Sequence, residues 1–277
     1  MPALLIPLLL LSACGKQEDQ AQPAKPDARA TAQALATSQA TPPAGSASAS
    51  AEAGGARKVS VSNAFYEYDY AYPAAVGAIP ALKAQLDAEA ATSQHELDQQ
   101  SREASKDAKG DGYPFNPWSS GTDWQVVTDL PGWLSLSAQV YSYEGGAHPN
   151  HGYSALLWDK HANQRRSVID LFTSKAALTK VLSEPFCAQL DTERAKRRDT
   201  PVQRGSGDQF DECIDPTEST LILGSTDKAH FNRIGVLIGP YEAGPYAEGD
   251  YDITLPVTDA VLALVKPEYR QYFAVKR

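Results

Sequence analysis

The composition of this chain changes abruptly near residue 58, and that change limits where a hydrophobic core can form. Residues 15–57 consist mainly of Ala, Gln, Ser, Thr, Pro and Gly, contain no aromatic residue, and have Leu35 as their single branched aliphatic residue. Such a segment buries too little apolar surface to offset its chain entropy. We therefore predict a disordered tether over residues 14–57. The following stretch of about 220 residues is long enough for one large domain or two small ones.

An apolar run, Ala3–Leu11, precedes the tether and ends in the sequence LSAC at residues 11–14. Small residues ahead of a cysteine are typical of lipoprotein signal processing, and the run is shorter than the roughly 20 apolar residues that a membrane-spanning helix needs. We predict a signal peptide over residues 1–13 and attachment to a membrane through a lipid on Cys14. The expected location is the cell envelope, at the periplasmic face of the outer membrane if the cell is Gram-negative, because Gly15 rather than Asp follows the cysteine.

Cysteine content and net charge bound the chemistry of the remaining chain. Cys187 and Cys213 form an even pair in an oxidising compartment, which predicts a disulfide; two separate buried thiols are the alternative. A metal site at these cysteines is less favoured because neither has a C-x-x-C partner or a neighbouring His. The formal net charge of −9 and the pI near 5.1 argue against a nucleic-acid partner. They are compatible with a cationic protein ligand.

Hydrophobic periodicity predicts helices and strands in blocks rather than in regular alternation. We expect a strand-like entry over Val59–Tyr72, a helix over residues 79–108 that starts near Pro80 and stops at Gly110 and Gly112, and a half-buried strand over Trp133–Tyr143. That strand forms a hairpin with a strand around residues 155–158, beyond a loop at residues 144–150. The remaining expected elements are a helix over 174–197, strands at 220–223, 234–238 and 251–257, and a helical stretch over 258–272.

These blocks predict an α+β fold with a mostly antiparallel sheet and packed helices. Basic residues at positions 194–198 fall at the end of the second helix, where cations favourably complement the helix dipole, so we assign them that role. A polar insert follows at residues 199–218.

The sequence YEGGAHPNH at residues 143–151 is the densest polar motif. His148 and His151 with Glu144 allow a metal site to be drawn, but glycine loops seldom hold ligands at fixed spacing and a third ligand is not identifiable. The favoured interpretation is a turn in which the two glycines adopt unusual backbone angles and the first histidine bonds to loop carbonyls. The motif residues that we select here are Tyr143, Gly145, Gly146 and His148.

A second motif, GPYEAGPYAEG, occupies residues 239–249. Glu242 and Glu248 could act as an acid/base pair if they met in a cleft, but hydrogen bonds that stabilise the loop are favoured. Tyr241 and Tyr246 suit a protein-binding face, because Tyr gives large contact area at low entropic cost. These four residues complete the candidate binding set.

These motifs resemble a known pair of families. The sequences YSYEGGAH at 141–148, DLF at 170–172, PYE at 240–242 and PYAEG at 245–249 resemble domain-of-unknown-function family 3298, which would cover residues 134–277. The region 58–133 looks like family 4163, which usually precedes it. Such pairs occur in the extracellular part of anti-sigma factors that bind lysozyme and beside peptidoglycan deacetylases. The resemblance implies an envelope-facing binding module without the signalling or catalytic attachment.

No catalytic motif accompanies these features: the sequence has no G-x-S-x-G elbow, no H-E-x-x-H, no P-loop and no Rossmann glycine pattern. We therefore assign no catalytic residue, no metal and no cofactor, and an enzyme is the less favoured class. The expected function is non-covalent binding of an envelope protein, such as lysozyme, or of peptidoglycan. A cell-wall-modifying hydrolase, an enzyme that works with a deacetylase, and a purely structural envelope lipoprotein are the alternatives.

Overall fold

The computed structural model describes residues 46–51 and 55–276, which belong to one compact unit of the chain. The predicted signal peptide (1–13), Cys14 and most of the predicted tether lie outside these residues. No helix in the described ranges has the length and apolar character needed to cross a membrane. The segment Ser46–Ala51 forms a strand, so the prediction of disorder is wrong there. This strand lies at a sheet edge, where backbone pairing with its neighbour holds it without the apolar burial that a core requires.

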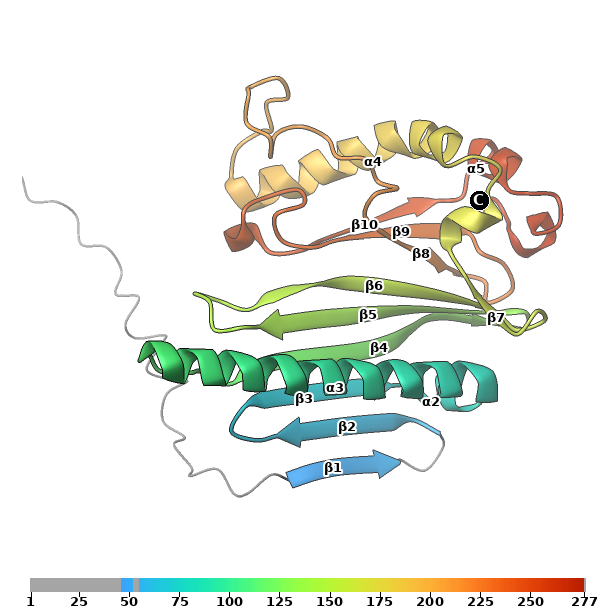
Figure 1. Cartoon of the computed structure of the whole chain (residues 1–277). Helices are drawn as coiled ribbons and strands as arrows, with labels where there is room; N and C mark the ends of the chain where they lie inside the picture. Colours follow the sequence, from blue (N-terminus) through green and yellow to red (C-terminus); the bar gives the residue numbers. More distant parts are fainter. Residues whose placement is uncertain (1–45, 52–54, 277) are drawn as a thin grey trace, which may run out of the picture. The chain divides into compact units, whose positions relative to one another are not determined.

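The larger sheet has seven strands arranged in chain order (Figure 1). Its pairs are antiparallel except β3–β4, which is parallel because helices connect those two strands. The predicted boundary at residue 133 falls between two paired strands, so the two sequence regions contribute to one sheet. The strands are β1 (Ser46–Ala51), β2 (Arg57–Ser62), β3 (Tyr66–Tyr72), β4 (Trp118–Leu130), β5 (Trp133–Tyr143), β6 (Asn150–Asp159) and β7 (Gln164–Arg166).

Helix α3 (Pro80–Asp111) covers one face of this sheet and follows the short α2 (Ala74–Gly77). The predicted helix is confirmed and extends to Asp111, where Gly112 ends it with a φ of 78°. Its apolar stripe packs on the alternate tyrosines of β3. These buried rings still satisfy their hydroxyls: Tyr68 donates to the carbonyl of Ala90 at 2.9 Å, and Tyr70 accepts from Trp124 Nε1 at 3.0 Å. The tyrosine-rich entry therefore forms core, as two strands rather than one.

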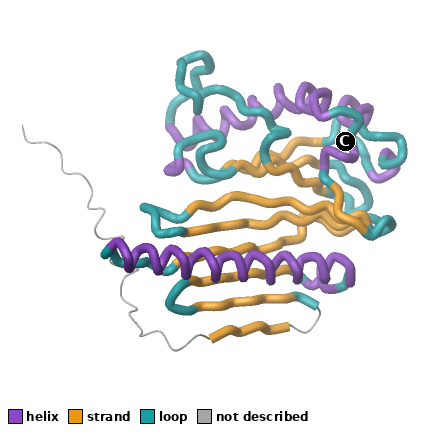
Figure 2. Tube along the Cα trace, viewed as in Figure 1, coloured by secondary structure: helices purple, strands orange, loops and turns teal. Residues whose placement is uncertain are grey.

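A second layer lies on the opposite face of β4–β6 (Figure 2). It contains a three-stranded antiparallel sheet of order β10-β9-β8, covered by helix α4. A hydrophobic core of aliphatic and aromatic side chains joins this sheet, α4 and the Trp133 and Leu157 side of the large sheet. After β7, the chain forms η1 (Val168–Leu171), α4 (Lys175–Arg198), β8 (Thr220–Gly224), β9 (Arg233–Ile238), η2 (Tyr246–Glu248) and β10 (Tyr251–Pro256).

The fold class predicted from sequence is confirmed: the described chain is α+β with mostly antiparallel pairing. The final helical stretch is the exception. Helix α5 (Asp259–Leu264) ends at an extended Val265, and only η3 (Arg270–Tyr272) follows before the end of the described chain. Pro267 disfavours the helical conformation at the residue before it, so the predicted helix over 258–272 is broken.

Strand β5 shows how the second layer leaves part of the large sheet open. Its apolar side, including Leu134 and Leu136, is buried under α3 as predicted. On its polar side Ser135 is only 1% exposed because the second layer covers it, whereas Gln139 and Tyr141 are exposed. The prediction of a half-buried strand is therefore correct only at the Tyr141 end. That open end is the floor of the candidate site.

Candidate functional site

The two motifs selected from sequence lie together in the folded chain. One belongs to the loop between β5 and β6, the other to the loop between β9 and β10. The His148 ring stacks on Tyr246 with 4.0 Å between ring centroids, and Tyr241 lies 6.4 Å from the same histidine ring. The Tyr246 hydroxyl donates to the carbonyl of Pro149 at 3.0 Å. We call His148, Tyr241 and Tyr246 the aromatic cluster.

Hydrogen bonds fix the orientation of this cluster. His148 Nδ1 donates to the Pro149 carbonyl at 3.0 Å, as predicted, and its Nε2 lies 3.3 Å from the Tyr241 hydroxyl, which donates to it. Tyr241 has a φ of 69°, in the region that non-glycine residues seldom adopt, and the residue is 53% exposed. Gly145 has a φ of 88°, as predicted, but Gly146 does not adopt a positive φ. The loops thus present a preformed aromatic surface.

Beneath the aromatic cluster lies a second set of polar contacts centred on Asp250. Its carboxylate accepts from His151 Nε2 at 2.7 Å and from the Tyr153 hydroxyl at 2.6 Å. Burial, followed by the contact with this carboxylate, raises the pKa of Tyr153, which keeps that phenol protonated. Tyr246 packs edge-on against the His151 ring. Asp250 therefore orients a histidine at the base of the site.

The metal interpretation finds no assembled ligand set. Each histidine of the first motif has a separate partner, Tyr241 for His148 and Asp250 for His151. Within the described ranges, no group of three or more His, Cys, Asp or Glu residues is placed to hold a metal ion.

The two glutamates of the second motif are held by different partners. Glu242 accepts from the Gly239 amide at 2.9 Å and from the Ser219 hydroxyl at 3.0 Å. Glu248 accepts two hydrogen bonds from Arg198, at 2.7 and 3.0 Å, and one from the Tyr251 hydroxyl. Burial acts to raise the pKa of Glu248, but these hydrogen bonds outweigh it and hold the pKa below its ordinary value. These contacts favour the loop-stabilising interpretation over an acid/base pair.

The basic residues at the end of α4 do more than complement the helix dipole. Arg194 is fully buried, and its Nε donates to the carbonyl of Ala243 at 2.8 Å while its Nη1 donates to the carbonyl of Glu212 at 2.9 Å. Arg197 lies 3.9 Å above the ring of Tyr251. The assignment to the dipole alone was therefore wrong, because tertiary contacts bring backbone acceptors to these side chains.

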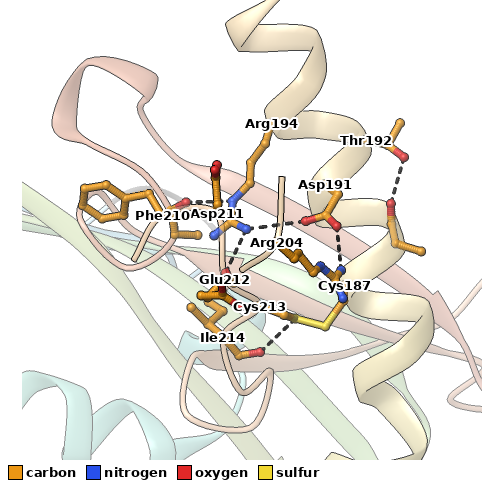
Figure 3. Close-up of polar contacts among 12 residues, drawn as sticks. Cys187, Asp191, Thr192, Arg194, Arg204, Phe210, Asp211, Glu212, Cys213 and Ile214 are labelled. Atoms are coloured by element: carbon orange, nitrogen blue, oxygen red, sulfur yellow. Dashed lines mark hydrogen bonds and ion pairs between the residues drawn. A yellow bond between two sulfur atoms is a disulfide. The ribbon is translucent and has the colours of Figure 1, made fainter. Parts of the chain in front are cut away.

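A disulfide anchors the polar insert beside this arginine (Figure 3). Cys187 of α4 and Cys213 are bonded, with 5.6 Å between their Cα atoms, so the predicted pairing is confirmed. Arg204 of the insert forms an ion pair with Asp191 of α4 at 2.6 Å. The insert is thereby held against α4, and Arg194 connects it to the loop that carries the aromatic cluster.

A groove crosses the open part of the large sheet and reaches His151, whose ring contacts Tyr246 of the aromatic cluster. It comprises two adjoining cavities of about 370 and 400 Å³ that share Tyr141. The Tyr141 ring lies over Gly121, where a side chain would overlap it, and its hydroxyl donates to Asp69 at 3.1 Å. Burial and this carboxylate raise the pKa of Tyr141 to about 12. The groove is lined by Lys58, Asp69, Asp123, Gln139, Tyr141, His151, Tyr153 and Glu242.

The residues selected from the two sequence motifs lie at the rim of this site, whereas its base contains residues outside that selection. Tyr143 ends β5 opposite Ser119, and none of the contacts that build the aromatic cluster involves it. Asp250 and Tyr153 were not singled out, and His151 was considered only as a metal ligand. Alternation offered a signal for Tyr141 and Tyr153, because both fall on the polar side of their strands.

Comparisons with known proteins give three findings. The family model Deacetylase PdaC matches residues 59–151, about a third of the chain, from β2 to the start of β6. The match overlaps the region 58–133 that resembles family 4163. No curated protein matches the chain.

The solved structures that are similar to the chain include two members of one family. A DUF3298 family protein from Pseudomonas aeruginosa PAO1 is 16% identical, with 85% of this chain and 98% of that chain covered and a TM-score of 0.43. A member of the same family from Bacteroides fragilis NCTC 9343 is 16% identical, with 76% of this chain and 89% of that chain covered and a TM-score of 0.40. Both belong to the domain-of-unknown-function family 3298 that the motifs resemble.

Proposed function

We propose that this chain is an envelope lipoprotein, anchored through Cys14, whose groove binds a cell-wall glycan without chemical change. The observation that carries this proposal is the groove centred on Tyr141, whose lining includes His151 next to the aromatic cluster. The exposed ring of Tyr141 can pack against the C–H face of a sugar, and the neighbouring Asp123 and Gln139 can hydrogen-bond to sugar hydroxyls or amides. Sites that combine an apolar surface with a few fixed polar groups are typical of small-ligand recognition.

The loops that close the groove support specific binding because they are ordered before a ligand arrives. The Pro149 carbonyl, His151 and Arg194 each hold a part of the loop between β9 and β10. Ordering a loop during association lowers affinity, so a site that is already fixed avoids that loss. The similarity to Deacetylase PdaC covers the strands that supply most of the groove floor. It supports a ligand of the cell wall.

The test is a sedimentation assay with insoluble peptidoglycan, using the full chain and two variants. Tyr141→Ala removes the central ring, and we expect about a tenfold loss of affinity, which corresponds to about 1.4 kcal/mol. Tyr113→Ala is the matched control, because Tyr113 is 55% exposed just beyond α3 and does not line the groove. Equal binding by the two variants, or none by the parent chain, would overturn the proposal.

A lysozyme binding curve distinguishes the other expected ligand class. The chain has a net charge of −9 and the groove contains Asp69, Asp123 and Glu242, so a cationic protein has suitable charge. Saturable binding of lysozyme that Tyr141→Ala weakens, without binding to peptidoglycan, would replace the glycan by a protein ligand.

A second candidate function, a wall-modifying enzyme, is favoured by one contact. Asp250 bonds to His151 at 2.7 Å, and the histidine lines the cavity that also contains Glu242. A carboxylate that orients an imidazole is the arrangement of a general base. The assay is release of acetate or soluble fragments from peptidoglycan. Any turnover that His151→Gln abolishes would support catalysis, whereas turnover unchanged in that variant would exclude this assignment.

A further inference from the structure

A separate cavity of about 530 Å³ lies where β7 stops pairing with β6. Its floor is the exposed edge of β6, and its walls come from β7, the start of η1 and the segment 217–221. Ser219 lines this cavity and donates to Glu242 of the groove, so that hydrogen bond stands between the two sites. None of the sequence motifs contributes a residue to its lining.

The charged side chains that line this cavity are both arginines, in a chain whose overall charge is negative. Arg165 forms an ion pair with Glu89 of α3, with 3.3 Å between Nη1 and Oε1. Arg166 Nε lies 3.8 Å from Oδ2 of Asp159, beyond hydrogen-bond distance. The other polar neighbour of this guanidinium is the neutral amide of Gln164. A guanidinium carries five N–H donors, and these partners leave the positive charge of Arg166 incompletely balanced.

Two backbone carbonyls on the β6 edge already accept hydrogen bonds, which argues against addition of a peptide strand there. Arg165 Nη2 donates to the carbonyl of Ala155 at 3.2 Å, and the Thr220 hydroxyl donates to the carbonyl of Tyr153 at 3.1 Å. Strand addition needs such carbonyls as acceptors. What the cavity offers instead is positive charge above the apolar side chains of Leu157 and Leu221. Low-dielectric surroundings strengthen a charge interaction.

We propose that this cavity is a second binding site, which takes an oxyanion, a carboxylate or a phosphate, carried by an acidic ligand. Arg166 binds the oxyanion through two parallel N–H donors, a geometry that a planar guanidinium provides and an ammonium does not. Arg165 contributes the second positive charge, and the Ser167 hydroxyl supplies a further donor at the cavity wall. This site is independent of glycan binding in the groove.

The experiment is an NMR titration of the full chain, with ¹⁵N-labelled arginine, that follows the Nε–Hε signals of Arg165 and Arg166. Inorganic phosphate and acetate are the two probes, each at constant ionic strength set with sodium chloride. We expect saturable shifts of both signals. Arg166→Gln should abolish saturation at Arg165, and Arg166→Lys should weaken binding at least about tenfold because it keeps charge but loses the paired donors.

Lys106→Gln on α3 is the control, since it makes the same change in net charge at an exposed position outside the cavity. It should leave the titration unchanged. Tighter phosphate binding supports a phosphate-bearing ligand, and tighter acetate binding supports a carboxylate-bearing one. Absence of saturation with both probes, or the same shifts in Arg166→Gln as in the parent, would overturn the proposal. Thermal unfolding of each variant checks that the chain is folded.

Discussion

The two long helices among the described residues, α3 and α4, each cover one sheet but use their charged residues differently. Helix α3 buries only apolar or small side chains, and its cations stay at the surface, where Arg102 pairs with Asp98 one turn away. Helix α4 buries Arg194 and a disulfide cysteine within its apolar stripe. The difference shows that the structural role of a basic helix residue depends on which hydrogen-bond acceptors the fold places next to it.

The sharpest way to test this comparison is to replace Arg194. Arg194→Met keeps much of the volume but leaves the carbonyls of Ala243 and Glu212 without their donor. A buried unsatisfied group costs about 1–3 kcal/mol, so we expect the free energy of unfolding to fall by about 3–5 kcal/mol. Urea denaturation measures this loss. If the free energy of unfolding falls by less than about 1 kcal/mol, the usual range for a surface contact, then Arg194 contributes no more than the exposed cations of α3 do.

The disulfide gives the next largest effect. Cys187 and Cys213 are 26 residues apart, and closing a loop of that size typically stabilises a domain by about 2–4 kcal/mol. We expect the double variant Cys187→Ala/Cys213→Ala to lose that amount in urea denaturation and to expose the insert to limited proteolysis. The parent chain under reducing conditions should behave in the same way. Equal stability of the oxidised and reduced chains would show that the other contacts of the insert are sufficient.

The same comparison shows which parts of the fold could be predicted from the sequence. Both helices were located because Leu82 and Leu86, or Leu178 and Leu182, recur at helical spacing, and periodicity reports burial on one face. Pro80 and Gly112 added start and stop signals that depend only on local backbone preferences. The cysteine pair was predicted from its even number and the expected compartment. These features are all local or compositional.

The base of the candidate site depends on contacts that local patterns do not report. His151 and Asp250 are 99 residues apart and meet because β6 and the loop before β10 are packed together. Ser135 is buried because the second layer lies over it, which alternation along β5 alone does not show. The strand Ser46–Ala51 was missed for the opposite reason, since backbone pairing stabilises it without the apolar residues that a core requires.

Glu248 provides a smaller test with a defined pH dependence. Its pKa in the folded chain is lowered, because the hydrogen bonds from Arg198 and Tyr251 outweigh its burial. A lowered pKa means that the stabilisation is complete above the ordinary glutamate pKa of about 4.3 and is lost as pH falls through the folded value. We expect Glu248→Gln to cost about 1–2 kcal/mol at neutral pH and to flatten the acid limb of the stability curve. An unchanged acid limb would contradict this role.

The smallest effect should come from Arg102 on α3, which has the same charge as Arg194 but is exposed. Its Nε bonds to both carboxylate oxygens of Asp98, at 2.9 and 3.0 Å, and its guanidinium lies 4.2 Å from the centre of the Phe65 ring. Water can replace the ion pair, and exposed pairs contribute about 0.2–1 kcal/mol. Arg102→Ala should therefore lower the free energy of unfolding by less than about 1 kcal/mol, mostly in a salt-dependent way. A loss as large as that of Arg194→Met would show that exposure does not decide the role of these cations.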